Sequence, residues 1–189
     1  MNAYKHIREL WKKPKENLGQ LYRQRLIEWR RTNSIVRVDR PTRLDRARNL
    51  GYKAKQGYII ARVRLLRGGR QRPLIKSGRR SKHRRRVKIL GMSYQWVAEQ
   101  RANSKYPNCE VLNSYYLAKD GRYYWYEVIL ADRELVSKYP SMEWLAYTKG
   151  RAYRGLTSAA RKSRGLRGKG KGYEKNRPSL AAHGKRGKN

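Results

Sequence analysis

The chain has 189 residues and carries 49 Lys and Arg against 13 Asp and Glu, so its formal net charge is +36. This length favours a single domain with a modest core. A charge this large indicates a polyanionic partner, because binding would release condensed counterions. No segment approaches the ~18 consecutive apolar residues of a membrane-spanning helix, and the first residues lack the apolar core of a signal peptide. We therefore expect a cytoplasmic protein with no membrane partner.

Aromatic residues supply part of the apolar content, since the chain has 15 Tyr and 5 Trp but no Phe. A low aliphatic content with a high net charge is typical of disorder, whereas clustered aromatics are typical of a core. The sequence therefore predicts a small folded body with basic extensions. Cys109 is the only cysteine, which excludes an intrachain disulfide and a cysteine zinc cluster.

The N-terminal part predicts two helices and a strand. Apolar residues recur at helical spacing over residues 3–12, and Pro14 interrupts this pattern. A longer amphipathic helix is predicted over residues 15–31, with an aromatic and aliphatic stripe that favours a core role over a ligand site. Alternating residues over 34–39 predict a short strand.

A basic helix is predicted next. Thr42 and Asp45 form a capping-box pattern just after Pro41, and Gly51 is placed to end the helix after Leu50. A strand is then predicted over 58–66, with two opposite faces. One face carries Ile59, Ala61, Val63 and Leu65, and the other carries Tyr58, Ile60, Arg62 and Arg64.

The segment from Arg67 to Lys88 is the most basic part of the chain, with eleven Lys and Arg and no acidic residue. Such a composition cannot form a core, because like charges repel and little apolar surface is available to bury. A helix with Ser93 as its N-cap is predicted to follow, reaching about Lys105. We expect the basic segment to be a long loop, anchored at both ends and ordered by RNA.

A β-hairpin gives the clearest local signal. Two alternating runs, 111–118 and 123–131, flank the pair Asp120-Gly121, which is typical of a type I′ turn. A two-residue loop at this pair fixes the register. It predicts a shared core face that carries Val111, Tyr115, Leu117, Tyr124, Tyr126, Val128 and Leu130.

Charge separates the hairpin region from the C-terminal part. Residues 106–145 contain six acidic and four basic residues, whereas residues 149–189 contain fourteen basic residues and one acid. We interpret this contrast as an anionic side of the body opposite a cationic remainder. Thr157 is predicted to cap a short helix, and the Gly-rich residues beyond Gly165 are predicted to be disordered until they bind.

The sequence gives little support to an enzymatic function. The run Gly168–Gly172 follows no predicted strand, and the chain has no G-x-x-x-x-G-K-[ST] motif. His6, His83 and His183 are far apart and have no metal-ligand spacing, so no catalytic residue, metal or cofactor is predicted. Duplex DNA could attract the same charge, but no recognition helix, finger or basic zipper is evident. RNA fits better, because Arg pairs with phosphates and planar side chains stack on splayed bases.

Four segments of the chain resemble a known family. NAYKHIRELW, RPTRLDRARNLGYKAKQGYIIARVRLLRGGRQRP, VLNSYYL and RGLTSAARKSRGL resemble the archaeal and eukaryotic large-subunit ribosomal proteins of the L15e family, over roughly residues 2–167. The resemblance implies an α+β body with a small mixed or antiparallel sheet. It also implies a structural role in the large ribosomal subunit, with ribosomal RNA and neighbouring ribosomal proteins as partners. The short tail favours an archaeal source.

These observations predict one body over residues 1–150, with a basic loop inserted at 67–90, and a basic extension over 151–189. The predicted RNA-binding residues of the matched motifs are Arg40, Arg43, Arg46, Arg48, Tyr52, Lys53, Lys55, Arg67, Gly68, Gly69, Arg70, Arg72, Arg154, Arg161, Lys162 and Arg164. Charge alone adds Lys76, Arg79, Arg80, Lys82, His83, Arg84, Arg85, Arg86, Lys88, Arg167, Lys169 and Lys171. No small-molecule substrate is expected.

Overall fold

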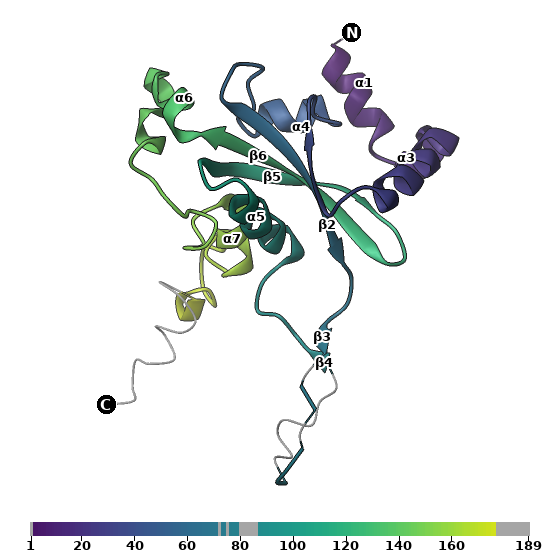
Figure 1. Ribbon diagram of the computed structural model, residues 1–189, viewed down its shortest axis with the longest axis vertical. Coiled ribbons are helices and arrows are strands. Elements are labelled where there is room, and N and C mark those ends of the chain that lie inside the picture. Colours follow the sequence, from purple (N-terminus) through teal and green to yellow (C-terminus); the bar gives the residue numbers. More distant parts are fainter. Residues whose placement is uncertain (1, 72, 75, 80–86, 177–189) are drawn as a thin grey trace.

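The computed structural model describes residues 2–71, 73–74, 76–79 and 87–176. Its centre is a four-stranded sheet in the order β1-β2-β6-β5, with every neighbouring pair antiparallel (Figure 1). The strands are β1 (Ile35–Val38), β2 (Tyr58–Leu66), β5 (Cys109–Lys119) and β6 (Tyr123–Asp132). The predicted α+β class is confirmed, and the sheet is antiparallel rather than mixed.

Short helices surround this sheet. They are α1 (Ala3–Leu10), α2 (Pro14–Asn17), α3 (Gly19–Arg31), α4 (Leu44–Asn49), α5 (Tyr94–Lys105), α6 (Arg133–Ser137) and α7 (Ser158–Ser163), with 3₁₀ turns η2 (Pro140–Leu145) and η3 (Glu174–Asn176). The single helix predicted over 15–31 is therefore wrong in one respect. It is divided before Gly19, whose φ of +44° is a left-handed conformation that interrupts the helical path.

Helix ends follow the sequence signals closely, with one exception. The side chains of Ser93 and Thr157 accept hydrogen bonds from the backbone N–H groups of α5 and α7, as predicted for N-caps. Gly51, with a φ of +98°, follows the C-cap of α4. The capping box predicted at Thr42 is wrong. No side chain caps α4, and Thr42 instead donates to the carboxylate of Glu127 on β6.

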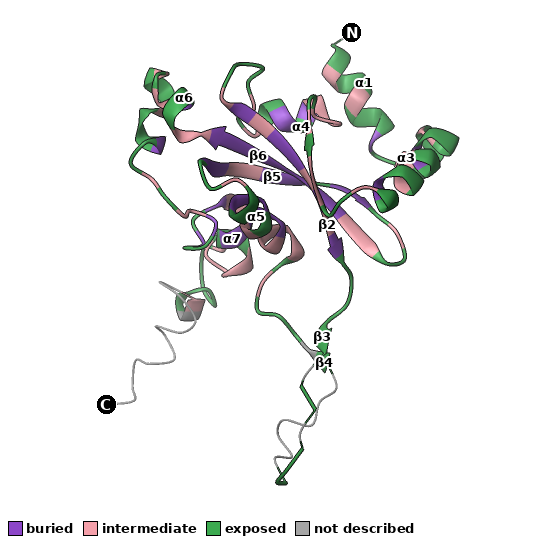
Figure 2. Ribbon diagram, in the orientation of Figure 1, coloured by how far each residue is buried: buried purple, intermediate pink, exposed green. Residues whose placement is uncertain are grey.

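Both faces of the sheet are buried, which Figure 2 shows as buried segments along β2, β5 and β6. One face packs on α5 and contains Ala61, Val63, Leu65, Ala98, Ala102, Val111, Val128 and Leu130. The opposite face packs on α1, α3 and α4 and contains Trp11, Tyr22, Trp29, Ala47, Ile60, Tyr115, Leu117, Trp125 and Ile129. The two faces predicted for β2 are confirmed, since Val63 and Ile60 lie in different clusters.

The hairpin register differs from the prediction. Val111 is opposite Leu130, but the pairing shifts between Val111 and Asn113 and again between Tyr116 and Ala118. Each shift adds a residue to β5 only, so the strand no longer alternates strictly. Tyr115 and Leu117 therefore pack in the cluster under α1, α3 and α4, not on the face predicted for them. Both faces of the hairpin are core.

The turn of the hairpin is also not the predicted type I′ turn at Asp120-Gly121. The N–H of Asp120 donates to the carbonyl of Tyr123, so Gly121 and Arg122 form the tip. Neither Asp120 nor Gly121 has the positive φ that the type I′ turn requires. The Asp120 carboxylate accepts from the N–H groups of Arg122 and Tyr123, at 2.7 and 2.6 Å, and closes the turn instead.

Candidate RNA-binding surface

The described part of the basic segment Arg67–Lys88, which follows β2, projects from the body and is called the arm below (Figure 1). Its base is a two-stranded ribbon, β3 (Arg70–Gln71) and β4 (Val87–Lys88), in which Arg70 pairs with Lys88 and Gln71 with Val87. The prediction of a loop without structure of its own is therefore wrong at this neck. The residues predicted to bind RNA at 72, 80 and 82–86 lie outside the described residues, as does the Lys88 side chain.

Arg67 and Gly68 attach the arm to the body. Arg67 donates from its guanidinium to the carbonyl of Asp120 at 2.6 Å, and its guanidinium lies 5.1 Å from the ring centre of Tyr124. Gly68 donates its N–H to the Tyr94 hydroxyl at 2.8 Å, and that hydroxyl donates back to the Gly68 carbonyl at 2.9 Å. Both residues fix the direction of the arm, and the Gly68 amide is already engaged. Gly69, Arg70, Lys76 and Arg79 are exposed.

A second basic cluster lies where α1 meets α4. Arg46 and Arg43 line a small cavity of about 260 Å³ together with Arg8, Asn49 and Tyr116. Arg8 was missed by the sequence argument, which considered only the apolar face of that helix. Its spacing, four residues after Tyr4, places it beside the half-buried face of that helix, and this is the signal that could have identified it.

The arginines of this cluster differ in how accessible their charges are to a partner. Arg43 is largely buried, forms an ion pair of 3.4 Å with Asp45 and lies over the Trp11 ring at 5.3 Å. Its charge is therefore engaged within the body. Arg46 and Arg48 are exposed on α4, and the Arg48 guanidinium lies 5.6 Å from the ring centre of Tyr4. Arg46 is thus the residue of this helix with the most accessible charge.

The remaining predicted residues of the middle motif lie between β1 and β2. Arg40, Lys53 and Lys55 are exposed, and the Lys55 ammonium lies 5.1 Å from the ring centre of Tyr139. Tyr52 is half-buried and meets Tyr58 edge-on, with ring centres 6.4 Å apart. The Tyr52 ring therefore packs in the body, and the lysines provide the accessible charge.

The C-terminal basic residues are presented by α7, by the turns after it and, for Arg154, by the turn before it. Arg154, Arg161, Lys162, Lys169 and Lys171 are exposed. Arg164 is half-buried and donates to the Gly155 carbonyl at 3.1 Å, while Arg167 donates to the Ser158 hydroxyl. Residues 177–189 of the predicted extension lie outside the described residues.

The arm and α7 are joined at their bases. The backbone N–H of Ser93, where the arm enters α5, donates to the hydroxyl of Ser163 at 3.0 Å. The exposed Arg161 and Lys162 lie on the same short helix as Ser163. Two basic segments that are distant in sequence therefore leave the body from neighbouring points, and one polyanion could contact both.

Three of the six acidic residues of the hairpin region are engaged within the fold and do not contribute to the anionic side that the sequence predicts, whereas Glu134 and Glu143 are exposed. Glu110 is buried and accepts from the N–H groups of Gly150 and Arg151, at 2.6 and 3.2 Å. Glu127 is buried and accepts from Thr42 and Tyr115. Asp120 closes the hairpin turn, as described above. These three acids, which look like surface charge in the sequence, are therefore used as acceptors within the fold.

Glu99 on α5 is a further buried carboxylate. It accepts from the hydroxyls of Thr157 and Ser114, and Gln95 donates to the Ser114 carbonyl at 2.9 Å. Burial raises the pKa values of Glu99 and Glu127, and their hydrogen-bond donors oppose this shift in part. Cys109 is buried, as predicted, and burial raises the pKa of its thiol to about 11.

In the part of the chain that the structure describes, no group of three or more His, Cys, Asp or Glu side chains could hold a metal ion. No helix within the same residues is long and apolar enough to cross a membrane.

A comparison with protein families shows to which family the chain is related. The family model described as Ribosomal L15 matches residues 2–183. The chain belongs to the ribosomal L15e family. The resemblance inferred from the four sequence segments is therefore confirmed, and it extends across nearly the whole chain.

Archaeal relatives support the same assignment. A chain from Methanocella arvoryzae is 51% identical over 99% of this chain and 98% of its own length. Chains from Nanoarchaeum equitans and Picrophilus torridus are 52% and 50% identical, covering 97% and 98% of this chain and 98% of their own lengths. All three relatives carry the name large ribosomal subunit protein eL15. The sequence similarity thus extends over nearly the full length of chains that are named as ribosomal proteins.

Proposed function

We propose that the chain is a structural constituent of the large ribosomal subunit, where it binds and stabilises ribosomal RNA. Membership of the L15e family carries this proposal, together with relatives named as large-subunit proteins over almost their full length. The net charge of +36 agrees with an RNA partner. The chain would act in the cytoplasm, within the subunit, and would contribute to assembly and translation rather than catalyse a reaction.

The distribution of charge supports a mechanism in which separate basic segments hold separate parts of the RNA. The exposed arginines of α4 and Arg8 lie on the side of the sheet that packs on α1, α3 and α4, whereas the arm and α7 leave the body from neighbouring points elsewhere (Figure 1). Arginine pairs with phosphates in a two-pronged geometry, so each segment can fix one stretch of RNA backbone. The buried sheet keeps the segments at fixed positions, which favours one RNA arrangement over others.

Sedimentation tests the proposal directly. A tagged copy of the chain, expressed in archaeal cells, should travel with the large subunit through a density gradient and remain there after a moderate salt wash. Ribonuclease treatment should release it. Recovery of the chain as a free protein, or on chromatin, would overturn the proposed function.

A further inference from the structure

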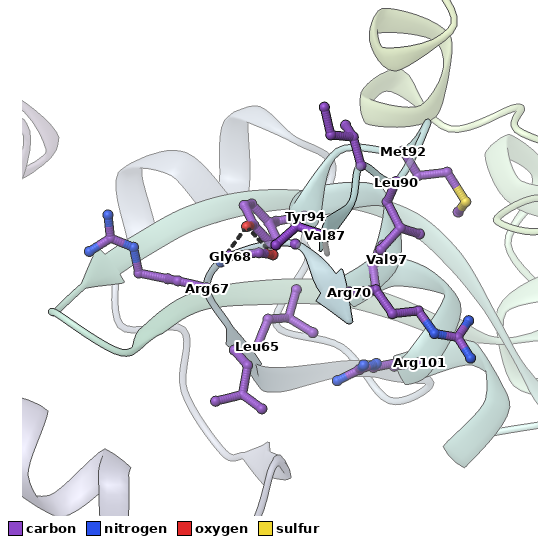
Figure 3. Close-up of a pocket in the computed structure, with 13 residues that line it drawn as sticks. Leu65, Arg67, Gly68, Arg70, Val87, Leu90, Met92, Tyr94, Val97 and Arg101 are labelled. Atoms are coloured by element: carbon purple, nitrogen blue, oxygen red, sulfur yellow. Dashed lines mark hydrogen bonds between the residues drawn. The ribbon is translucent and has the colours of Figure 1, made fainter. Parts of the chain in front are cut away.

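An apolar groove lies at the base of the arm, between the end of β2, the ribbon β3–β4 and the start of α5 (Figure 3). It has a volume of about 780 Å³, which is within the usual range for a binding pocket. Aliphatic side chains form much of its lining: Leu65, Leu66, Val87, Ile89, Leu90 and Met92. Leu66 and Ile89 are 69% and 82% exposed, so the groove is open to solvent in the isolated chain.

This concentration of exposed aliphatic surface needs an explanation. In the centre of the sheet Val63 and Leu65 are buried, and the exposed residues begin one position later, at Leu66. Leu66 comes from one side of the arm and Ile89 from the other, so the ribbon brings them to one place. Contiguous exposed apolar side chains mark an interaction site in soluble proteins, because water contact is unfavourable for them.

The ribbon beside the groove also favours an additional strand. Only two residue pairs connect β3 and β4. A ribbon of two strands is marginally stable in water by itself, and each of its edges presents unpaired backbone groups. An extended peptide could pair with such an edge and place alternate side chains in the adjoining groove.

The aliphatic lining favours a protein segment over an RNA base, and the arginines at its border favour an acidic segment. Arg70 and Arg101 border the groove at one end, and Figure 3 shows Arg67 directed away from them. No ion pair among the described residues involves Arg70 or Arg101. Bases bind by stacking on planar side chains, whereas most of the exposed apolar surface in this groove is aliphatic. Here Tyr94 is already engaged, since its hydroxyl bonds Gly68 and its ring centre lies 4.9 Å from that of Tyr124.

We propose that this groove binds an extended segment of a neighbouring protein, in which apolar residues alternate with Asp or Glu. The apolar side chains would cover Leu66 and Ile89, and the carboxylates would pair with Arg70 and Arg101. This inference rests on the proposed function, because the neighbour would belong to the same ribosomal subunit. The segment completes the base of the arm and holds it in one direction.

Photo-crosslinking in the assembled particle tests the inference. The photoreactive residue p-benzoylphenylalanine replaces Leu66 in one tagged chain and Ile89 in another, and cells are irradiated before the large subunit is isolated. Both positions should crosslink to one protein segment with alternating apolar and acidic residues. As a control, the same substitution at Leu21, which is 47% exposed on α3, should not reach that segment.

Other results would overturn the docking site. They include crosslinks from both groove positions to RNA, to a second copy of this chain, to a protein segment without acidic residues, or to nothing. The proposed function fails separately if the control chain itself does not sediment with the large subunit. A crosslinked segment of the expected composition would still support the groove in that case.

A charge reversal gives a second, independent measurement. Arg101→Glu should lower the yield of the Ile89 crosslink several-fold, since the new carboxylate would repel the acidic segment, while Arg101→Lys should retain most of it. Arg23→Glu, an exposed substitution on α3, is the matched control and should leave the yield unchanged. Equal yields in the Arg101→Glu and Arg23→Glu chains would contradict the predicted charge of the partner.

Discussion

The hydroxyl of Thr157 donates a hydrogen bond of 2.5 Å to the carboxylate of Glu99, and both side chains are fully buried. The same hydroxyl oxygen accepts from the N–H of Ala160 and caps α7. Ser114 on β5 donates to the other oxygen of Glu99. One buried carboxylate thus joins the C-terminal basic helix, α5 and the sheet, so the position of α7 depends on this contact.

The titration of Glu99 should be visible in the stability of the chain. Burial raises its pKa above the ordinary value of 4.5, so the folded state binds the proton more tightly than the unfolded state. The protonated Glu99 carboxyl therefore contributes to the free energy of unfolding. This contribution is fully present at low pH and is lost as pH rises from about 4.5 through the folded pKa. In urea unfolding at several pH values, Glu99→Gln should therefore gain stability relative to the natural chain over this range.

A matched control separates this contribution from the rest of the chain. Glu134→Gln alters an exposed carboxylate at the start of α6 and should leave the pH dependence unchanged. The same pH dependence in the Glu99→Gln chain and the natural chain would contradict the assignment to Glu99.

Tyr115 should contribute to stability through its hydroxyl, which donates to buried Glu127. Tyr115→Phe removes one hydrogen bond, while Thr42 still donates to both oxygens of the carboxylate, so the expected cost is that of a single hydrogen bond, about 0.5–1.5 kcal/mol. Denaturant unfolding should show a loss of this size. Tyr147→Phe, at a tyrosine that is 87% exposed, should change the unfolding free energy little. A loss of equal size in both chains would argue against a role for the buried contact.

Gly57 is a position where any side chain should be costly. A Cβ there would lie 2.7 Å from Val136 Cγ2 and 3.0 Å from Leu135 Cβ, and the φ of +90° is itself unfavourable for other residues. Gly51 has a similar φ of +98° but open space around it. Thermal unfolding should therefore show a larger loss for Gly57→Ala than for Gly51→Ala. Equal losses would mean that backbone conformation, and not the contact with α6, determines the cost.

The salt dependence of RNA affinity should distinguish exposed arginines from arginines that are held by contacts within the body. If Arg46 contacts a phosphate, Arg46→Gln should lower the slope of log affinity against log salt by roughly 0.7–0.9. Arg43 is held by Asp45 and Trp11, so Arg43→Gln should mainly lower the unfolding free energy. Filter binding to large-subunit RNA at several salt concentrations, from about 50 to about 200 mM, measures the first effect. An unchanged slope for Arg46→Gln would remove Arg46 from the interface.

Hydrogen exchange should separate the sheet from its basic extensions. Backbone amides of β5 and β6 should exchange slowly in the isolated chain, since this hairpin is buried on both faces. Amides over residues 69–71, 87–90 and 167–176 should exchange faster than those of the hairpin and become protected in the assembled subunit. Uniform protection across the isolated chain would contradict the model of a folded body with RNA-ordered extensions.

Local sequence determined much of this protein. Turn, cap and periodicity signals lie within a few neighbouring residues, which is why Ser93, Thr157 and Gly51 occupy their predicted positions. The two faces of β2 followed from strict alternation, and the basic segments followed from charge. Four unusual sequence segments were enough to indicate the family.

Only the tertiary structure decided the hairpin register and the use of the acids. Two bulges displace Tyr115 and Leu117 to the opposite face, and alternation gives no warning because helices cover both faces. The bonds from Thr42 to Glu127 and from Thr157 to Glu99 join residues 85 and 58 positions apart. A carboxylate looks the same in sequence whether it meets solvent or a buried donor, so its role depends on the partners that folding brings to it.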